Sequence, residues 1–220
     1  VNMWIIQDKI FGEETNLLVE ALKSNNITYK LIANLIDDYN VIVDYSNFIC
    51  RGSIDFVNSY TWYPKRLTLE NYDYTKYSKY FKGLLLNEDY IVLPWWRLYN
   101  YQDIIFRAFP EAENFFIRPN SGKKLFVGTT LSKKWWIKEL DIIKGLPSSQ
   151  INYEDLVIIS TKKPIEAECR VLLYKNEIID FDYYEGKQER GDLKFIENFA
   201  KKCEYFPDNF YIMDIAFSEN

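Results

Sequence analysis

Residues 116–128 form one recognisable unit, which consists of a strand, a tight polar loop and a second strand. Arg118 ends the first strand and Lys124 begins the second, while Gly122 lies in the loop and Gly128 closes the unit. Backbone N–H groups can point inward at such a turn, and the two cations supply compensating charge. The pattern predicts a hairpin that binds a polyphosphate.

Cations gather around this loop although the chain as a whole is acidic. The net charge is −5, yet residues 118–144 hold seven cations and two anions, so this island carries +5 and the remainder −10. A basic island favours a compact anion as ligand, and a solvated, lysine-rich helix face is the alternative. The negative net charge argues against general nucleic-acid binding.

Composition excludes several classes of site. The 220 residues are 48% apolar and 27% charged, which predicts one large folded domain or two small ones. The absence of histidine excludes Ser-His-Asp and Cys-His catalysis. The three cysteines lie far apart, so we expect reduced thiols in a cytoplasmic protein. No apolar run reaches the roughly 18 residues of a membrane span, and the first residues are too quickly polar for a signal peptide, so we expect no membrane partner.

The first 86 residues predict a small α/β domain. Strands are expected at 4–6 and 29–32 with a helix at 13–23 between them, and further strands at 41–43 and 48–50. A turn follows at Gly52–Ser53, where Ser53 is a candidate helix N-cap. The order strand, helix, strand predicts a parallel sheet.

Residues 87–220 predict a second domain that is richer in antiparallel strands. After an irregular stretch with short helices at 60–90, we expect helices at 94–109, 132–143 and 193–202, strands at 156–159, 165–174, 178–184 and 210–217, and a turn at Asn176–Glu177. Glu168 and Arg170 share one face of their strand because side chains alternate. Asp214 stands in an apolar strand and needs a cation or a metal as partner. The fold class is therefore α/β (α+β), a small N-terminal unit followed by antiparallel-sheet lobes.

Together these residues resemble the ATP-grasp superfamily, and within it a phage-associated clade of short members. The resemblance touches most of the chain, and it rests on Arg118-Pro119-Asn120-Ser121-Gly122 with Lys124, Phe126 and Gly128, on Leu156–Ser160, on Ala167–Arg170, on a tyrosine at 183 or 184, on Tyr211–Asp214, on Arg51–Ser53 and on Leu85–Asn87. It implies an ATP-grasp-like fold with the nucleotide site between the lobes.

The resemblance also implies an activity, an ATP- and Mg²⁺-dependent ligase that joins a carboxylate to an amine through an acylphosphate. The substrates would be small molecules or peptides. Phosphates would be held by Arg118, Ser121, Gly122 and Lys124, and adenine by the backbone of Val157, Ile158, Ile159 and Ser160. Arg170 and Glu168 would be catalytic, Asp214 would bind magnesium, and Arg51, Ser53 and Tyr183 would contact substrate. From the residues alone, without the resemblance, Glu168 and Arg170 would be interpreted as a strand-surface ion pair that contributes little energy.

One departure from the superfamily pattern keeps alternatives open. The strand that bears the aspartate is normally followed by a strand with a Glu-x-Asn motif, whereas here the sequence stops at Ser218-Glu219-Asn220. We therefore expect either a domain cut short at its C-terminal end or a degenerate member. A non-catalytic ATP-binding module is the alternative function, and an RNA-binding protein that uses the basic island is the lesser one.

Overall fold

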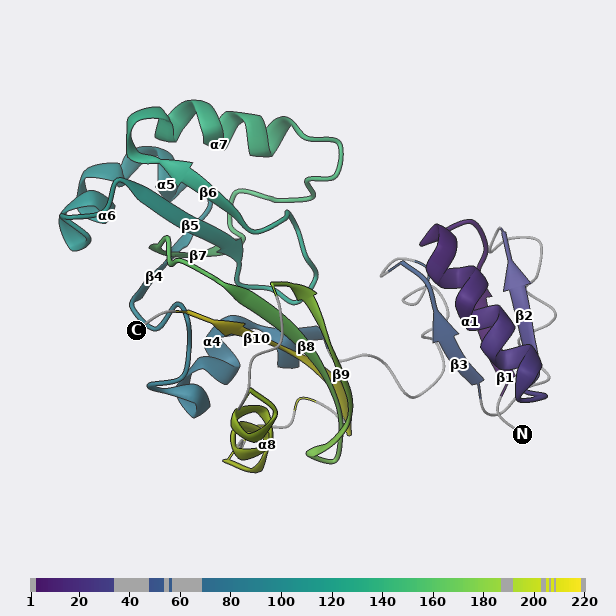
Figure 1. The fold of residues 1–220 in the computed structure, drawn as a ribbon. Coiled ribbons are helices and arrows are strands. Elements are labelled where there is room, and N and C mark those ends of the chain that lie inside the picture. Colours follow the sequence, from purple (N-terminus) through teal and green to yellow (C-terminus); the bar gives the residue numbers. More distant parts are fainter. Residues whose placement is uncertain are drawn as a thin grey trace. The chain divides into compact units, whose positions relative to one another are not determined.

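The computed structural model describes residues 3–33, 48–53, 56, 69–186, 192–202, 205, 207 and 209–218. The chain divides into two compact units, Val1–Leu67 and Thr68–Asn220 (Figure 1). The division falls at 67/68, earlier than the boundary we expected at 86/87. Residues just after it already belong to the larger unit, since the backbone N–H of Tyr74 donates to the carbonyl of Asn120 at 2.9 Å.

The first unit is a three-stranded parallel sheet with one helix. The elements are β1 (Met3–Gln7), α1 (Gly12–Ser24), β2 (Tyr29–Ile32) and β3 (Phe48–Arg51), and the strand order is β2-β1-β3. Met3, Ile5, Ile32 and Phe56 form its core, with Cys50 packed against it. The predicted parallel strand–helix–strand unit is confirmed. The expected strand at 41–43 lies outside the described residues.

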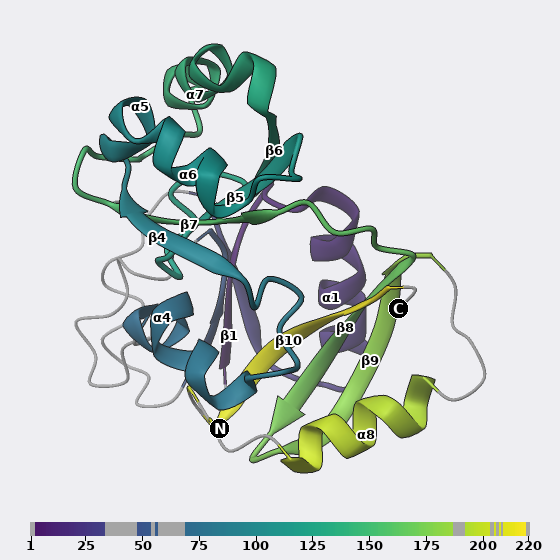
Figure 2. The same cartoon turned by 90° about the vertical axis from the view of Figure 1, so that its left-hand side faces the viewer.

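The second unit contains a four-stranded antiparallel sheet covered by helices. It follows the short helices η1 (Leu69–Tyr72), α4 (Tyr74–Tyr77) and η2 (Ser78–Phe81), and its strands are β4 (Tyr90–Pro94), β5 (Asn114–Pro119), β6 (Thr129–Ser132) and β7 (Leu156–Thr161), in the order β4-β7-β5-β6. On one face lie α5 (Arg97–Asn100), α6 (Gln102–Ala108), η3 (Lys133–Trp135) and α7 (Trp136–Gly145) (Figures 1 and 2). Phe115, Ile117, Val157 and Ile159 point into this core with Trp136 and Leu140.

Two expectations for this sheet are wrong. Residues 94–109 do not form one helix, because Pro94 ends the edge strand β4, where a missing N–H costs no ladder bond, and two short helices follow. The second strand of the hairpin begins at Thr129, so Lys124 lies in the loop with φ 51°. Leu125 and Phe126 are buried in the core and anchor the loop instead of forming a strand.

A second antiparallel sheet completes this unit. It consists of β8 (Ala167–Tyr174), β9 (Glu177–Glu185) and β10 (Phe210–Phe217) in the order β10-β8-β9, with α8 (Asp192–Lys202) packed on one face (Figure 2). Cys169, Val171 and Leu173 face α8. The turn is Lys175–Asn176, one residue before the predicted one, because both residues adopt the positive φ (47° and 68°) of a two-residue hairpin.

Among the described residues, no helix is both long and apolar enough to cross a bilayer. Cys169 is a buried cysteine thiol and Cys50 a partly buried one. Burial raises the pKa of Cys50 to about 12, so its thiol stays protonated at neutral pH.

Candidate functional site

The loop between β5 and β6 is fixed at both ends. Asn120 is buried, and its side-chain Oδ1 accepts a hydrogen bond from the Thr75 backbone N–H at 3.0 Å. Its own N–H donates to the Leu156 carbonyl at 2.9 Å. At the other end Leu125 and Phe126 are buried in the core. The short stretch 121–124 is therefore held out between two anchors, with Lys123 and Lys124 exposed.

Glycine is required where the loop returns toward β6. A Cβ on Gly128 would lie 2.8 Å from the Cζ of Phe116, which is too close for any side chain without movement of that ring. The backbone N–H of Gly122 donates a hydrogen bond to Asp73 Oδ1 at 3.3 Å. Asp73 thus supplies a carboxylate oxygen where the predicted ligand has a phosphate oxygen.

Arg118 lies between two tyrosines rather than in open solvent. Its guanidinium carbon is 5.4 Å from the ring centre of Tyr74. Burial raises the pKa of Tyr77, while the charge of Arg118 and a hydrogen bond from it act in the opposite direction. Both phenols stay neutral at physiological pH, so Arg118 keeps its full positive charge available for an anion.

The four residues predicted to contact adenine lie in the middle of the first sheet. Val157, Ile158, Ile159 and Ser160 are fully buried, and each pairs with β4 on one side and β5 on the other. The Ser160 hydroxyl donates to Asn87 Oδ1 at 3.0 Å. The two ladders engage the backbone groups of these residues, and the chain leaves the strand only after Thr161.

A second cluster of charges lies on the exposed face of the sheet β10-β8-β9. Arg170 and Asp214 are direct cross-strand neighbours and form a two-point ion pair, with Nε to Oδ1 at 2.8 Å and Nη2 to Oδ2 at 3.0 Å. On its other side Arg170 is paired in register with Asp182. Glu168 points to the same face, as the strand alternation predicted. Arg170 is therefore a cation flanked by carboxylates from three strands.

Tyr184 completes this cluster, and sequence reasoning left it out of the predicted site. Arg170 lies 5.2 Å from its ring centre. Burial raises the pKa of Tyr184, and the charge of Asp214 and a hydrogen bond with Glu168 raise it further. The predicted residue, Tyr183, faces the other way, opposite Cys169, with its ring stacked on Phe217 at 6.0 Å. Because successive side chains of a strand alternate, only one of the two tyrosines can share a face with Arg170, and the register between β8 and β9 decides which.

Asp214 suits a hard metal ion chemically but is engaged elsewhere. Both of its carboxylate oxygens are taken by Arg170. The described residues hold no group of three or more aspartate, glutamate or cysteine side chains that could bind a metal ion by themselves. Magnesium prefers oxygen ligands and commonly shares them between one or two carboxylates and substrate phosphates. Asp214 therefore fits as one ligand of a shared site.

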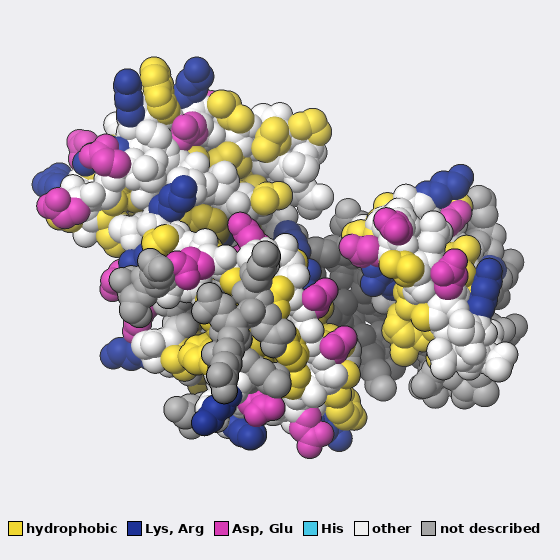
Figure 3. Space-filling model, in the orientation of Figure 1, with side chains coloured by type: hydrophobic (Ala, Val, Ile, Leu, Met, Phe, Trp, Pro, Cys, Tyr) yellow, Lys and Arg dark blue, Asp and Glu magenta, His cyan; other side chains and the backbone are white. Residues whose placement is uncertain are grey.

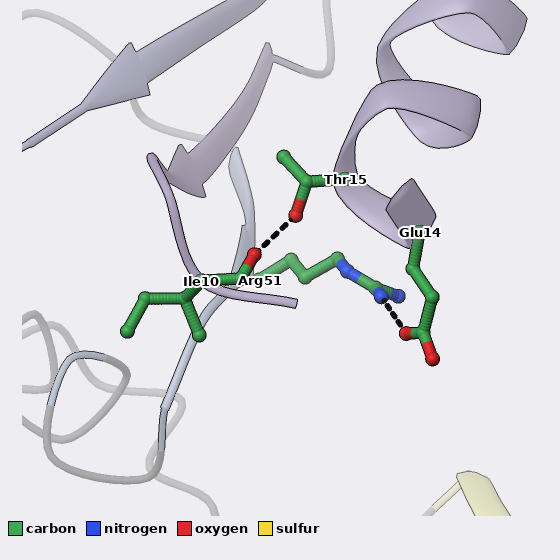
Figure 4. A network of polar contacts seen from close by, with 4 residues as sticks. All are labelled: Ile10, Glu14, Thr15 and Arg51. Carbon is green, nitrogen blue, oxygen red and sulfur yellow. Dashed lines mark hydrogen bonds and ion pairs between the residues drawn. The ribbon is translucent and has the colours of Figure 1, made fainter. Parts of the chain in front are cut away.

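Arg51 and Ser53 belong to the first unit and lie at the C-terminal end of β3. Arg51 Nη2 contacts Glu14 Oε2 at 2.8 Å (Figure 4). The Arg51 guanidinium also lies 5.4 Å from the ring centre of Phe11. The Ser53 hydroxyl accepts from the Phe56 N–H at 3.1 Å, and the Ser53 N–H donates to Gln7 Oε1 at 2.8 Å. Because the order β2-β1-β3 reverses at β1, these residues stand where open parallel sheets bind ligands.

Neither a protein-family model nor a curated protein matches the sequence. Solved structures do match it along almost its whole length. The D-cycloserine synthetase DcsG has a TM-score of 0.63 at 10% identity, over 99% of this chain and 90% of that chain. An ATP-grasp RimK domain protein from Sphaerobacter thermophilus gives 0.57 at 12% identity, over 99% and 90%.

The D-alanine–D-alanine ligase of Bacillus anthracis, in its complex with ATP, gives a TM-score of 0.55 at 11% identity, over 99% of this chain and 84% of that chain. Identity this low carries the fold and not the substrate. With its parallel N-terminal unit, its two antiparallel sheets and these neighbours, the chain has the fold of the ATP-grasp ligases.

Proposed function

We propose that this protein is an ATP-dependent carboxylate–amine ligase that works through an acylphosphate. The observation that supports it best is that one compact unit of this fold carries both a cationic loop and the pair Arg170–Asp214. The resemblance assigns the loop to phosphate, Arg170 to catalysis and Asp214 to magnesium. The finer resemblance, to the phage-associated clade, belongs to the same proposal.

Phosphate binding falls to the loop and to the strand before it. Arg118 and Lys124 would neutralise phosphate oxygens, and the N–H of Gly122 would exchange the Asp73 carboxylate for one of them. Ser121 already orders the loop, since its hydroxyl accepts from the Lys123 N–H at 3.1 Å. A nucleotide thus meets donors whose backbone is fixed in advance.

Adenine recognition needs backbone groups outside the sheet ladders. Because Val157–Ser160 are paired on both sides, we assign this contact to residues 162–166, between β7 and β8. That connection joins the two sheets of the second unit. The start of this connection is anchored to β5, because the N–H of Lys162 donates to the Asn114 carbonyl at 3.2 Å.

The proposed chemistry has two displacements. A carboxylate oxygen attacks the γ-phosphorus and ADP leaves; the amine nitrogen then attacks the acyl carbon, phosphate leaves, and the amine loses a proton. Arg170 would turn from Asp214 to the anionic acylphosphate, while Glu168, through its hydrogen bond with Tyr184, would hold the ring against which the guanidinium lies. Magnesium, when bound, offsets the negative charge of the phosphates, and the freed Asp214 carboxylate is its protein ligand.

The substrate class is proposed from the neighbours. Two are named as a D-cycloserine synthetase and a D-alanine–D-alanine ligase, and a third, PsnB, was solved with a minimal precursor at a TM-score of 0.54. An amino acid or peptide carboxylate with an amine is consistent with these names. Arg51 and Ser53 remain predicted substrate contacts in the first unit.

The first test is the thermal shift with Mg·ATP, compared with magnesium alone. At roughly 100 times its dissociation constant the ligand should stabilise the protein by about 2.7 kcal/mol. The double variant Arg118→Ala/Lys124→Ala should lose this shift, whereas Arg107→Ala/Lys194→Ala removes the same charge from exposed helix positions and should keep it. A shift that survives in the first variant would sink the phosphate assignment.

The alternative, an ATP-binding module without turnover, is favoured by one observation. Arg170 holds both oxygens of Asp214, which leaves magnesium to find its ligands elsewhere. ADP release in the presence of mixed amino acids and amines separates the two functions. Binding with amine-dependent release supports the ligase, and binding without release under any mixture supports the module.

A further inference from the structure

Helix α7 and the turn before it present a surface that the proposed function does not use. This surface, the α7 face, consists of Lys134, Trp135, Lys138 and Ile142, with Leu146 just after the end of the helix. It lies on the side of α7 that points away from the sheet, and Figure 3 shows apolar and basic side chains interleaved over α7 at the top of the larger unit. Its lysines come from the basic island of the sequence.

The apolar part of the face is large for an exposed surface. The exposed fractions are 51% for Trp135, 55% for Ile142 and 46% for Leu146. Ile142 lies on the exposed side of α7, Trp135 is the last residue of η3 just before the helix, and Leu146 directly follows its last residue. The opposite side is already satisfied, since Trp136 and Leu140 are buried in the core. Trp135, Ile142 and Leu146 are therefore exposed apolar side chains that are not part of this core cluster.

The cations of the face are not neutralised. None of its lysines forms an ion pair with a described residue. The Nζ atoms of Lys134 and Lys138 lie 5.1 and 5.5 Å from the Trp135 ring centre, so they surround an apolar group with charge.

The two acids of α7 accept hydrogen bonds from neutral donors and form no ion pair with the lysines of the face. Glu139 Oε2 accepts from the Ser132 N–H at 2.6 Å, and Asp141 Oδ1 accepts from the Tyr99 hydroxyl at 3.1 Å. Asp141 lines the same hollow as Lys134, Trp135 and Lys138, so the face combines two lysines and one carboxylate with exposed tryptophan and aliphatic side chains.

We propose that the α7 face docks on an anionic lipid surface. Lysines attract lipid phosphates, tryptophan prefers the headgroup level, and aliphatic side chains enter the acyl boundary. A nucleic acid would use the lysines and Trp135 but gains nothing from Ile142 and Leu146. An extended peptide needs a groove or a strand edge, whereas this face is a helix ridge. The sequence led us to expect no membrane partner because it lacks a spanning segment, and peripheral docking needs none.

The test is co-sedimentation of the full chain with phosphatidylcholine vesicles, with and without phosphatidylglycerol. We expect binding only to the anionic vesicles, and loss of binding at high salt. Lys134→Glu/Lys138→Glu should weaken binding by more than roughly tenfold, since each lysine near such a surface contributes several-fold in affinity. Trp135→Ala/Ile142→Ala should weaken it while keeping the salt dependence.

Controls decide between a docking face and general electrostatics. Lys194→Glu/Lys201→Glu makes the same charge change on α8 and should leave vesicle binding unchanged. All substitutions are at exposed positions, and unchanged melting temperatures will verify the fold. The proposal is overturned if the parent does not bind anionic vesicles, or if the charge reversals on α7 and on α8 weaken vesicle binding equally. It is also overturned if the lysines of the face bind a single-stranded RNA and replacement of Ile142 has no effect on vesicle binding.

Discussion

Two arginine–carboxylate pairs, one in each compact unit, are built differently. Arg51 touches Glu14 through one nitrogen, and the two side chains are 35% and 71% exposed. It joins the end of a strand to the first turn of α1, where the helix dipole already favours a negative charge. Arg170 grips Asp214 through two nitrogens, from the centre strand of a sheet to a neighbouring strand.

Arg51–Glu14 is a local contact within the first unit, whereas the guanidinium of Arg170 is held in a defined orientation on an exposed sheet face. Two parallel hydrogen bonds fix the plane of the Arg170 guanidinium, and Tyr184 and Asp182 fix its surroundings. At 53% and 45% exposure, however, water competes for both partners, so a new anion or cation can divide the pair at small cost. Arg51 makes one replaceable contact with Glu14, and its neighbour in register on β1 is the apolar Ile6.

The largest difference should come from neutralising each carboxylate. Asp214→Asn removes the proposed metal ligand, so most of the roughly 2.7 kcal/mol stabilisation by saturating Mg·ATP should disappear. Glu14→Gln, the same change in the first unit, should leave that stabilisation unchanged. Thermal shift measures both, and equal behaviour of the two variants would show that the Arg170–Asp214 pair has no special place in nucleotide binding.

Replacing each arginine with lysine sharpens the comparison at the level of stability. Lysine cannot make the two-point contact, so Arg170→Lys should lower the free energy of unfolding by about 0.5–1 kcal/mol. Arg51→Lys keeps a single contact and should cost about 0.3 kcal/mol or less. Urea unfolding gives both values, and a larger loss at position 51 would contradict the distinction drawn from geometry.

The smallest effect should be a pH dependence that only the second cluster has. The pKa of Tyr184 is raised on folding, so the unfolded chain releases this proton first, and stability falls as pH rises above about 10. Tyr184→Phe should therefore lose less stability between neutral pH and high pH than the parent does. Tyr183→Phe is the matched control, and a shallower curve in that variant instead would reverse the assignment of the two tyrosines.

The faces of the strands could be predicted from the sequence, but their neighbours could not. The alternation at 167–174 correctly places Cys169 inside and Arg170 outside, because one face of an antiparallel sheet is buried. That Arg170 meets Asp214, and not Glu168, depends on register with a strand forty-four residues later. The register shift between Leu172 and Leu173 decides which tyrosine shares the face, because it brings Asp182 opposite Arg170 and Tyr183 opposite Cys169.

The hairpin shows a second limit. The apolar run Leu125–Phe126 has the composition of a strand, and the structure uses it to fill the core between α7 and the sheet. Tertiary burial outweighs local strand preference there. Likewise Pro94 is compatible with a helix start or an edge strand, and only the partner strand β7 selects between them.

Asn120 has a consequence for how binding at the loop would be felt elsewhere. The backbone N–H groups of Tyr74 and Thr75 both donate to this one residue, 45 positions along the chain for Thr75. Any ligand that stiffens the loop also slows hydrogen exchange at these two amides, and any ligand that strains it speeds that exchange. The exchange rates of the Tyr74 and Thr75 amides in α4 therefore report whether a ligand is bound at residues 121–124.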